Sequence, residues 1–384
     1  MYSRFEAALD AAIAAGRIAG AVALVTDRDG VTYRHAAGVR SVSAPAKMDQ
    51  GTVFWIASMT KAVVSVAALQ LVEQGKLSLD GDLAQLLPDL ADLQVLDGVD
   101  GAGKLKTRPA TVKVTLRHML THTCGMAYGF TSPQAQAYIE ASGSDPNSGS
   151  RAALKQALLF EPGEGFVYGI GIDWVGVAIE AASGQRLDAY LRDHLLGPLD
   201  MADTGFAQTA EQEARKAGVH VRGPDGALMP FPFGMPADPE VLSGGGGLYS
   251  TAPDYGRFLR MLLNGGELDG VRVLSAQTVA GLSQSHTGPH RAVITSSQPM
   301  LSNDFNPYPE MVAGHGLATM VTPEATKDGR SAGSLAWAGL ANTYYWVDPV
   351  AGRAGTIMTQ LLPFADPEVL GLLGALERDT YAVV

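Results

Sequence analysis

The spacing of apolar and polar residues predicts β-strands near both ends of the chain. Residues 21–26 form a β-rich apolar run, and Asp29-Gly30 is a hairpin signal before a second strand-like run at residues 31–35. Further strand-like runs occupy residues 316–321, 335–337, 343–347 and 356–360. Strands from both ends, separated by a helical region, predict one antiparallel sheet that both ends of the chain build.

Helical spacing of apolar residues dominates the middle of the chain as far as about residue 215. We expect helices both in this region and nearer the two ends of the chain, at residues 5–15, 58–75, 114–120, 150–159, 172–182, 187–195, 253–263 and 366–381. The predicted fold class is α+β, an antiparallel sheet flanked by helices with an inserted, mainly helical lobe. Residues 1–52 and 220–384 would form the lobe with the central sheet, and residues 53–219 the helical lobe. A site at the junction of the two lobes is the default expectation.

Composition is that of an ordinary globular protein and narrows the range of partners. Of the 384 residues, 46% are apolar and 17% are charged, and the net charge is −11. This acidity argues against nucleic acid or an anionic membrane surface as the main partner. No apolar run of about eighteen residues suggests a membrane span. The N-terminus lacks a basic segment followed by an apolar one, so we expect a cytoplasmic protein unless a leader was removed.

One short motif carries the clearest chemical signal. Residues 58–61 read Ser-Met-Thr-Lys and open an apolar segment that extends to Val72. A serine and a lysine three positions apart on a helix lie on the same face, so hydroxyl and amine can touch. Apolar surroundings favour a neutral amine, and a neutral amine beside a hydroxyl is a general base beside a nucleophile. The alternative is that Ser58 only caps the helix, but no lysine of the chain other than Lys61 follows a serine by three positions.

Other candidate motifs are weaker. Tyr168 follows a turn at residues 161–165 and precedes a predicted helix, so it is either a core tyrosine or a proton shuttle near a lysine. The Gly-x-Ser-x-Gly motif of α/β-hydrolases is absent. His118 and His122 have a metal-binding spacing but lack the glutamate of the metalloprotease motif, so we expect structural histidines, no metal and no cofactor. The single cysteine, Cys124, excludes an intramolecular disulfide.

Several blocks together resemble the serine β-lactamase and penicillin-binding-protein superfamily in its class C-like branch, and within it the family VIII carboxylesterases. Residues 54–61 are similar to the nucleophile motif. Residues 115–126 are similar to the family's Leu-Leu-Thr-His-Thr-Ser-Gly-Leu block, with Cys124 in place of the usual serine. Residues 162–176 resemble the second catalytic motif, and residues 244–254 and 264–270 resemble two further blocks. The resemblance covers nearly the whole chain and implies a β-lactamase-like fold.

The resemblance also implies a role for each matching residue. Ser58 would be the acylated nucleophile, and Lys61 and Tyr168 would share its proton and deliver it to the leaving group. The oxyanion hole would consist of the backbone N–H groups of Ser58 and of Leu340, the latter on an edge strand that faces the nucleophile. The His-Thr block would support the helical lobe. Residues expected to line the substrate pocket are Tyr128, Ile170, Phe233, Trp337 and Gly339.

Two departures from the β-lactamases concern substrate recognition. Their Lys-Thr-Gly triplet, which binds a substrate carboxylate, aligns with Trp337-Ala338-Gly339, close to the Trp-Gly-Gly or His-Gly-Gly of family VIII esterases. An indole cannot pair with a carboxylate as an ammonium group does. The asparagine that β-lactamases of this branch have two residues after the tyrosine is Ile170 here, which cannot hydrogen-bond a substrate amide. Both departures favour ester hydrolysis over β-lactam hydrolysis.

These features predict a serine carboxylesterase that acts on small, short-acyl esters through an acyl-enzyme at Ser58. The alternatives on the same site are a β-lactamase, a hydrolase of D-amino peptides or amides, and an acyltransferase. A non-catalytic binding protein of the same fold is disfavoured, because Ser58, Lys61 and Tyr168 are all present. The expected partner is a small-molecule ester, and the sequence leaves the oligomeric state open.

Overall fold

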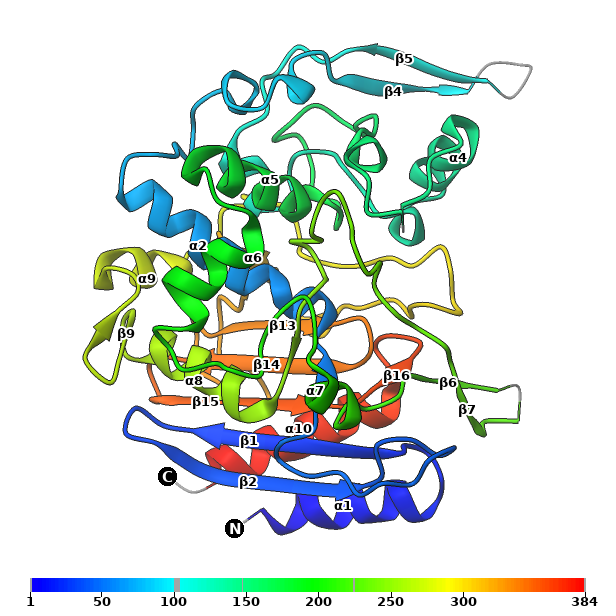
Figure 1. Ribbon diagram of the computed structural model, residues 1–384, viewed down its shortest axis with the longest axis vertical. Coiled ribbons are helices and arrows are strands. Elements are labelled where there is room, and N and C mark those ends of the chain that lie inside the picture. Colours follow the sequence, from blue (N-terminus) through cyan, green and yellow to red (C-terminus); the bar gives the residue numbers. More distant parts are fainter. Residues whose placement is uncertain (1, 100–103, 147, 224, 383–384) are drawn as a thin grey trace.

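In this computed structural model, which describes residues 2–99, 104–146, 148–223 and 225–382, both ends of the chain build one seven-stranded antiparallel sheet (Figure 1). The strand order is β11-β12-β13-β14-β15-β1-β2. β1 (Gly20–Thr26) therefore lies beside β15 (Arg353–Met358), although the two strands are far apart in the sequence. The prediction of an antiparallel sheet from both ends of the chain is confirmed.

Most of the remaining strands are short. Those of the large sheet are β2 (Val31–Gly38), β11 (Gly314–His315), β12 (Met320–Val321), β13 (Leu335–Gly339) and β14 (Thr343–Asp348). Those outside it are β3 (Phe54–Trp55), β4 (Gln94–Val99), β5 (Leu105–Pro109), β6 (His220–Arg222), β7 (Leu228–Pro230), β8 (Tyr249–Ser250), β9 (Glu267–Leu268), β10 (Val271–Arg272) and β16 (Leu361–Leu362). β3 pairs with β8, and β3 leads directly to Ser58.

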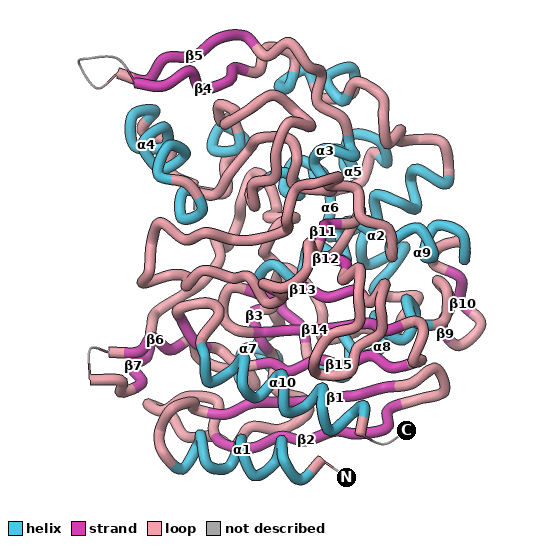
Figure 2. Tube along the Cα trace, turned by 180° about the vertical axis from the view of Figure 1, so that it is seen from behind, coloured by secondary structure: helices cyan, strands magenta, loops and turns pink. Residues whose placement is uncertain are grey.

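Helices cover both faces of the sheet. α1 (Ser3–Ala14) packs on β1 and β2 and against α10 (Pro367–Tyr381), on the face turned to the viewer in Figure 2. α8 (Ala252–Leu263) packs against β1, β14 and β15 on the opposite face. Every residue of β1 is buried, because helices lie on both of its sides.

One helix is enclosed by protein on all sides, α2 (Thr60–Glu73). All of residues 60–71 are buried, Lys61 included. A helix that is apolar all round is typical of a protein core. α2 packs against α5 (Gly171–Ser183). The other helices are α3 (Leu116–Leu120), α4 (Pro133–Ser142), α6 (Leu187–Leu191), α7 (Ala210–Ala214) and α9 (Ala276–Leu282).

Some predicted elements were wrong. The helix expected at 150–159 is only a 3₁₀ turn at Arg151–Leu154, because Leu158 forms a β-bridge with Val95 of the unpredicted β4–β5 hairpin. Of the strand expected at 316–321, only Met320–Val321 is a strand, β12, and residues 316–319 form the turn of the β11–β12 hairpin. Tertiary pairing overrides local helix propensity at such positions. The division of the chain into lobes at residues 53 and 220 stays a prediction.

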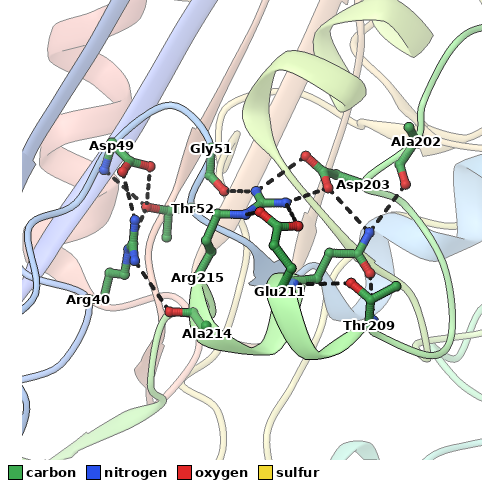
Figure 3. A network of polar contacts seen from close by, with 11 residues as sticks. Arg40, Asp49, Gly51, Thr52, Ala202, Asp203, Thr209, Glu211, Ala214 and Arg215 are labelled. Carbon is green, nitrogen blue, oxygen red and sulfur yellow. Dashed lines mark hydrogen bonds and ion pairs between the residues drawn. The ribbon is translucent and has the colours of Figure 1, made fainter.

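A polar network fastens the segment that precedes the nucleophile motif (Figure 3). The Arg215 guanidinium donates hydrogen bonds to the Asp203 and Glu211 carboxylates and to the Gly51 carbonyl. The backbone carbonyl of Arg215 in turn accepts a hydrogen bond from the Val53 N–H, with an N-to-O distance of 3.1 Å. Residues 203–215 therefore hold the chain at residues 51–53, directly before β3.

Candidate active site

Ser58 lies at a strained turn between β3 and α2. The 3₁₀ turn Ala57–Met59 runs into α2, and Ser58 is partly exposed between buried neighbours. Ala57 has φ +43°, in the left-handed region that non-glycine residues rarely adopt. Such strain persists only where surrounding contacts over-determine the backbone, and it is frequent at functional sites. The turn presents the Ser58 side chain at the end of a buried helix.

Lys61 places its amine among three oxygen atoms. Its Nζ lies 3.1 Å from Ser58 Oγ, 3.0 Å from Tyr128 Oη and 2.6 Å from the Gly245 carbonyl oxygen. The side chain is buried, with 2% of its surface exposed, so bulk water does not compete for these contacts. A hydroxyl and an amine at this distance can exchange a proton, which is the arrangement of an activated nucleophile.

Tyr128, which the sequence assigned to the pocket wall, contacts the lysine instead. Its hydroxyl accepts a hydrogen bond from Lys61, and it lies beside the Asp173 carboxylate, because a side chain at Gly245 would meet both Tyr128 Oη and Asp173 Oδ2. Burial raises the pKa of Tyr128 well above its ordinary value, and the nearby Asp173 and Tyr168 raise it further. The phenol therefore keeps its proton at neutral pH, beside both Lys61 and Asp173.

Tyr168 lies on another side of the same amine. Its ring centroid is 4.8 Å from Lys61 Nζ, a distance at which an ammonium group interacts with a ring face. Its hydroxyl accepts a hydrogen bond from Trp337 Nε1 at 3.3 Å. The structure thus brings Ser58, Lys61 and Tyr168 together, as the sequence predicted, although the hydroxyl beside the amine is that of Tyr128.

Two buried histidines stand behind Tyr168. The His122 ring lies 4.7 Å from the Tyr168 ring and 4.9 Å from the His315 ring. Burial lowers the pKa of His122 well below its ordinary value and that of His315 to about 4, so both rings are neutral at pH 7. This side of the lysine is aromatic and uncharged.

His122 also holds the backbone on both sides of Tyr168. Its carbonyl accepts the Val167 N–H at 3.0 Å, and its Nδ1 accepts the Gly169 N–H at 3.4 Å. His122 has φ +57° just after α3, where helices commonly end in glycine. A histidine at such a position indicates that its side chain is needed there.

The end of β13 lies against the turn that carries Ser58. A side chain at Gly339 would meet the Ile56 carbonyl oxygen at 2.3 Å, so only glycine allows this approach. The sequence predicted that this strand lies at the edge of the sheet, and this was wrong, because β13 lies between β12 and β14. However, β12 pairs only with Leu335 and Ala336 of β13, so within the described part of the chain the rest of β13 has no strand on that side. Leu340 follows in the turn to β14 and is partly buried. The oxyanion hole of Ser58 and Leu340 N–H groups stays a prediction.

An apolar cluster adjoins Ser58 through its neighbour Ala57. Its buried members include Trp55, Ala57 and Ala341, and Phe233 packs against it with its ring stacked 3.9 Å from that of Trp55. Other partly buried members are Val221, Met235, Leu301 and Leu340. Phe233 therefore lies against Trp55, three residues before Ser58, and its place in a substrate pocket stays a prediction. Ile170 is buried in the main core, at the start of α5.

Sequence reasoning missed three residues that shape this site: Asp173, Gly245 and His122. Each stood inside a block that was recognised, but only the folded chain shows what it contacts. Among the described residues, no group of three or more His, Cys, Asp or Glu side chains is placed to hold a metal ion. Within the same residues, no helix is both long and apolar enough to cross a membrane.

Comparison with known proteins gives one consistent family. A family model described as Beta-lactamase matches residues 5–377. Lovastatin esterase of Penicillium rubens is 32% identical, over 99% of this chain and 98% of its own length. Monacolin J acid methylbutanoyltransferase of Aspergillus terreus is 32% identical, over 98% of this chain and 95% of its own length. The structure of the LovD6 mutant of simvastatin synthase from Aspergillus terreus superimposes with a TM-score of 0.86 at 30% identity, covering 98% of this chain and 94% of that one.

Proposed function

This chain belongs to the beta-lactamase family, whose similar members are esterases and acyltransferases, and we propose that it cleaves small, uncharged carboxylic esters through an acyl-enzyme at Ser58. The observation that carries the proposal is the 3.1 Å contact between Ser58 Oγ and the buried amine of Lys61. It places a nucleophile and a base together at the edge of an apolar cluster.

The proposed chemistry has two steps. Ser58 Oγ attacks the ester carbonyl carbon while its proton passes to Lys61, and the Tyr168 hydroxyl supplies a proton to the departing alkoxide. The carbonyl oxygen would receive hydrogen bonds from the N–H groups of Ser58 and Leu340, where negative charge develops. In the second step water attacks the acyl carbon, its proton returns through the same groups, and Ser58 is released.

The surroundings of Ser58 favour an uncharged substrate. The side chain at the β-lactamase lysine position is Trp337, and its indole N–H is already engaged by the Tyr168 hydroxyl. Phe233 and Trp55 provide apolar surface next to the nucleophile. A carboxylate of a penicillin-like acid would lose its hydration there without gaining a cation, which is costly. We therefore expect weak β-lactam hydrolysis.

A second candidate function is transfer of the acyl group to an alcohol. Two of the similar proteins are named for methylbutanoyl transfer and simvastatin synthesis, and the same acyl-enzyme serves both outcomes. Apolar surface beside the nucleophile would favour an organic acceptor over water. Hydrolysis and transfer differ only in what attacks the acyl-enzyme.

The test compares p-nitrophenyl butyrate with a chromogenic cephalosporin, for wild type and Ser58→Ala. We expect ester turnover that Ser58→Ala abolishes and little cephalosporin cleavage. The control is Ser65→Ala, a buried serine on the same helix, which should stay active. Mass spectrometry should find one butyryl group, on the peptide that contains Ser58. Full ester turnover by Ser58→Ala would refute the mechanism.

Adding a primary alcohol to the same assay separates the two outcomes. If the acyl group passes to the alcohol, the butyrate ester of that alcohol appears, and p-nitrophenol release exceeds the formation of free butyrate. If only water attacks, the two products stay equal at every alcohol concentration.

A further inference from the structure

We propose that Asp173 is a positioning residue for this reaction: its carboxylate holds the two groups, Tyr128 and Gly245, that share the Lys61 amine with Ser58. This inference rests on the proposed function of Ser58 and Lys61. It adds the buried Asp173 carboxylate to the groups around the Lys61 amine, since this carboxylate hydrogen-bonds the Gly245 backbone and lies beside the Tyr128 phenol.

The contacts of Asp173 converge on the lysine from two directions. Asp173 Oδ1 accepts the Gly245 N–H at 3.0 Å, and the Gly245 carbonyl lies 2.6 Å from Lys61 Nζ. The same carboxylate lies beside the Tyr128 hydroxyl, which is 3.0 Å from Lys61 Nζ. Ser243 Oγ donates a further hydrogen bond to Asp173 Oδ1 at 2.8 Å. Two of the three oxygen atoms around the amine thus depend on one side chain.

The fold explains why a carboxylate is stable at this depth. Asp173 is 5% exposed and lies in the first turn of α5, where the helix dipole favours negative charge. Hydroxyl and backbone donors complete its hydrogen bonds, as a buried charge requires. No other role for this charge is visible among its described contacts, which all lead toward Lys61 or the loop that faces it.

The glycine loop opposite Asp173 is fitted to the carboxylate. A side chain at Gly245 would meet Asp173 Oδ2 at 2.5 Å and Tyr128 Oη at 2.8 Å. A side chain at Gly244 would meet the Ile172 carbonyl at 2.8 Å. These two glycines let the backbone approach α5 closely enough for the Gly245 peptide to bridge Asp173 and Lys61.

Asp173 would act by alignment, because it touches Lys61 only through Tyr128 and Gly245. If the carboxylate is lost, Tyr128 and the Gly245 peptide are free to move, and the amine no longer has one fixed place beside Ser58. The loss should appear in the acylation rate and leave substrate binding unchanged, because the hydrogen bonds of Asp173 run to Ser243 and Gly245, which are not members of the apolar cluster that would receive the ester.

The decisive variant is Asp173→Asn, which preserves shape and keeps an oxygen for the Gly245 N–H, but removes the negative charge beside the Tyr128 hydroxyl. We expect kcat per active site for p-nitrophenyl butyrate to fall about tenfold or more with KM nearly unchanged. Active sites are counted by burst titration, so a misfolded fraction does not lower the value. Asp254→Asn is the matched control, a buried carboxylate in the first turn of α8, and should keep its kcat per site.

A double-mutant cycle of Asp173 and Tyr128 tests whether Asp173 acts by positioning Tyr128 or only by stabilising the fold. Because Asp173→Asn breaks mainly the contact with Tyr128, it should cost little more once Tyr128→Phe has removed that hydroxyl. Additive losses in the double variant would overturn the proposal, as would an unchanged kcat per site in Asp173→Asn.

If Asp173→Asn does not fold, Gly245→Ala tests the same contacts by displacing the carboxylate and the phenol from the other side. It should lower kcat and not KM; an unchanged kcat would refute the inference. A wild-type enzyme without Ser58-dependent ester turnover would instead defeat the proposed function, whatever Asp173 does.

Discussion

The two sides of Lys61 are built from different chemistry. On one side stand Tyr128, Asp173 and the Gly245 carbonyl, a polar chain that ends in a buried carboxylate. On the other stand Tyr168 and Trp337, backed by neutral histidines. The polar side touches the amine through hydrogen bonds, and the aromatic side touches it through a ring face.

This difference separates two tasks that the proposed mechanism combines at Lys61. The polar side holds the amine in place. Of the described residues named above around Lys61, only Asp173 carries a carboxylate. The aromatic side provides the Tyr168 hydroxyl, which the indole N–H of Trp337 orients. Among the described residues, no charged side chain forms a hydrogen bond with this hydroxyl. We expect the polar side to govern alignment and the aromatic side to govern proton delivery to the leaving group.

The largest effect is expected where the two sides meet. Lys61→Met removes the amine and should lower kcat per active site about a thousandfold or more, within the range of general-base contributions. Lys76→Met, an exposed lysine just after the same helix, is the control. Steady-state turnover of p-nitrophenyl butyrate measures both. Only a small loss in Lys61→Met would mean that neither side acts through the amine.

The comparison itself is tested by two matched tyrosine variants. Tyr168→Phe should lower kcat about a hundredfold, because the leaving group loses its proton donor, whereas Tyr128→Phe should cost about tenfold, because only alignment suffers. Turnover is measured with leaving groups of increasing basicity. Only Tyr168→Phe should become worse as the leaving group becomes more basic. The opposite pattern would assign proton delivery to the polar side.

Trp337 tests how the Tyr168 hydroxyl is oriented. Trp337→Phe keeps an aromatic ring but removes the N–H that donates at 3.3 Å, and we expect a loss in kcat of about tenfold, as for one hydrogen bond. In the Tyr168→Phe background the same substitution should cost little. An equal loss in both backgrounds would make Trp337 a pocket wall alone, as the sequence first suggested.

A smaller effect is expected at His122, which holds the backbone around Tyr168. Asparagine tolerates the left-handed conformation at φ +57° and places an oxygen near the position of Nδ1, so His122→Asn should stay close to wild type. His122→Gly keeps the backbone freedom but lacks the acceptor, and should lose about fivefold in kcat per active site. Equal activities of the two variants would assign His122 to packing alone.

The smallest effect concerns stability and pH. The pKa of His315 falls from 6.5 to about 4 on folding, so the unfolded chain binds the proton more readily. This contribution to stability is present above pH 6.5 and is lost as the pH falls toward 4. His315→Gln should therefore show a smaller decrease in Tm than wild type between pH 7 and pH 4.5. A parallel decrease in both proteins would contradict the neutral, buried state of this ring.

Several parts of the molecule could be predicted because they depend on near neighbours in the chain. The Ser58–Lys61 contact follows from helical spacing, and the β1–β2 hairpin follows from its turn signal. The capping box at Thr115 is equally local. The helix expected at 150–159 failed because its residues pair with a distant hairpin.

By itself, the sequence determined the nucleophile motif, the antiparallel sheet from both chain ends, and the family, since each is written in local spacing or in short blocks. Only the tertiary structure decided which tyrosine contacts Lys61. Tyr128, Tyr168, Asp173 and Gly245 come from separate segments, and their contacts with one amine depend on how those segments pack around α2. Hydrogen bonds between residues 67 to 184 positions apart leave no periodic signal in the chain, because geometry in three dimensions selects them.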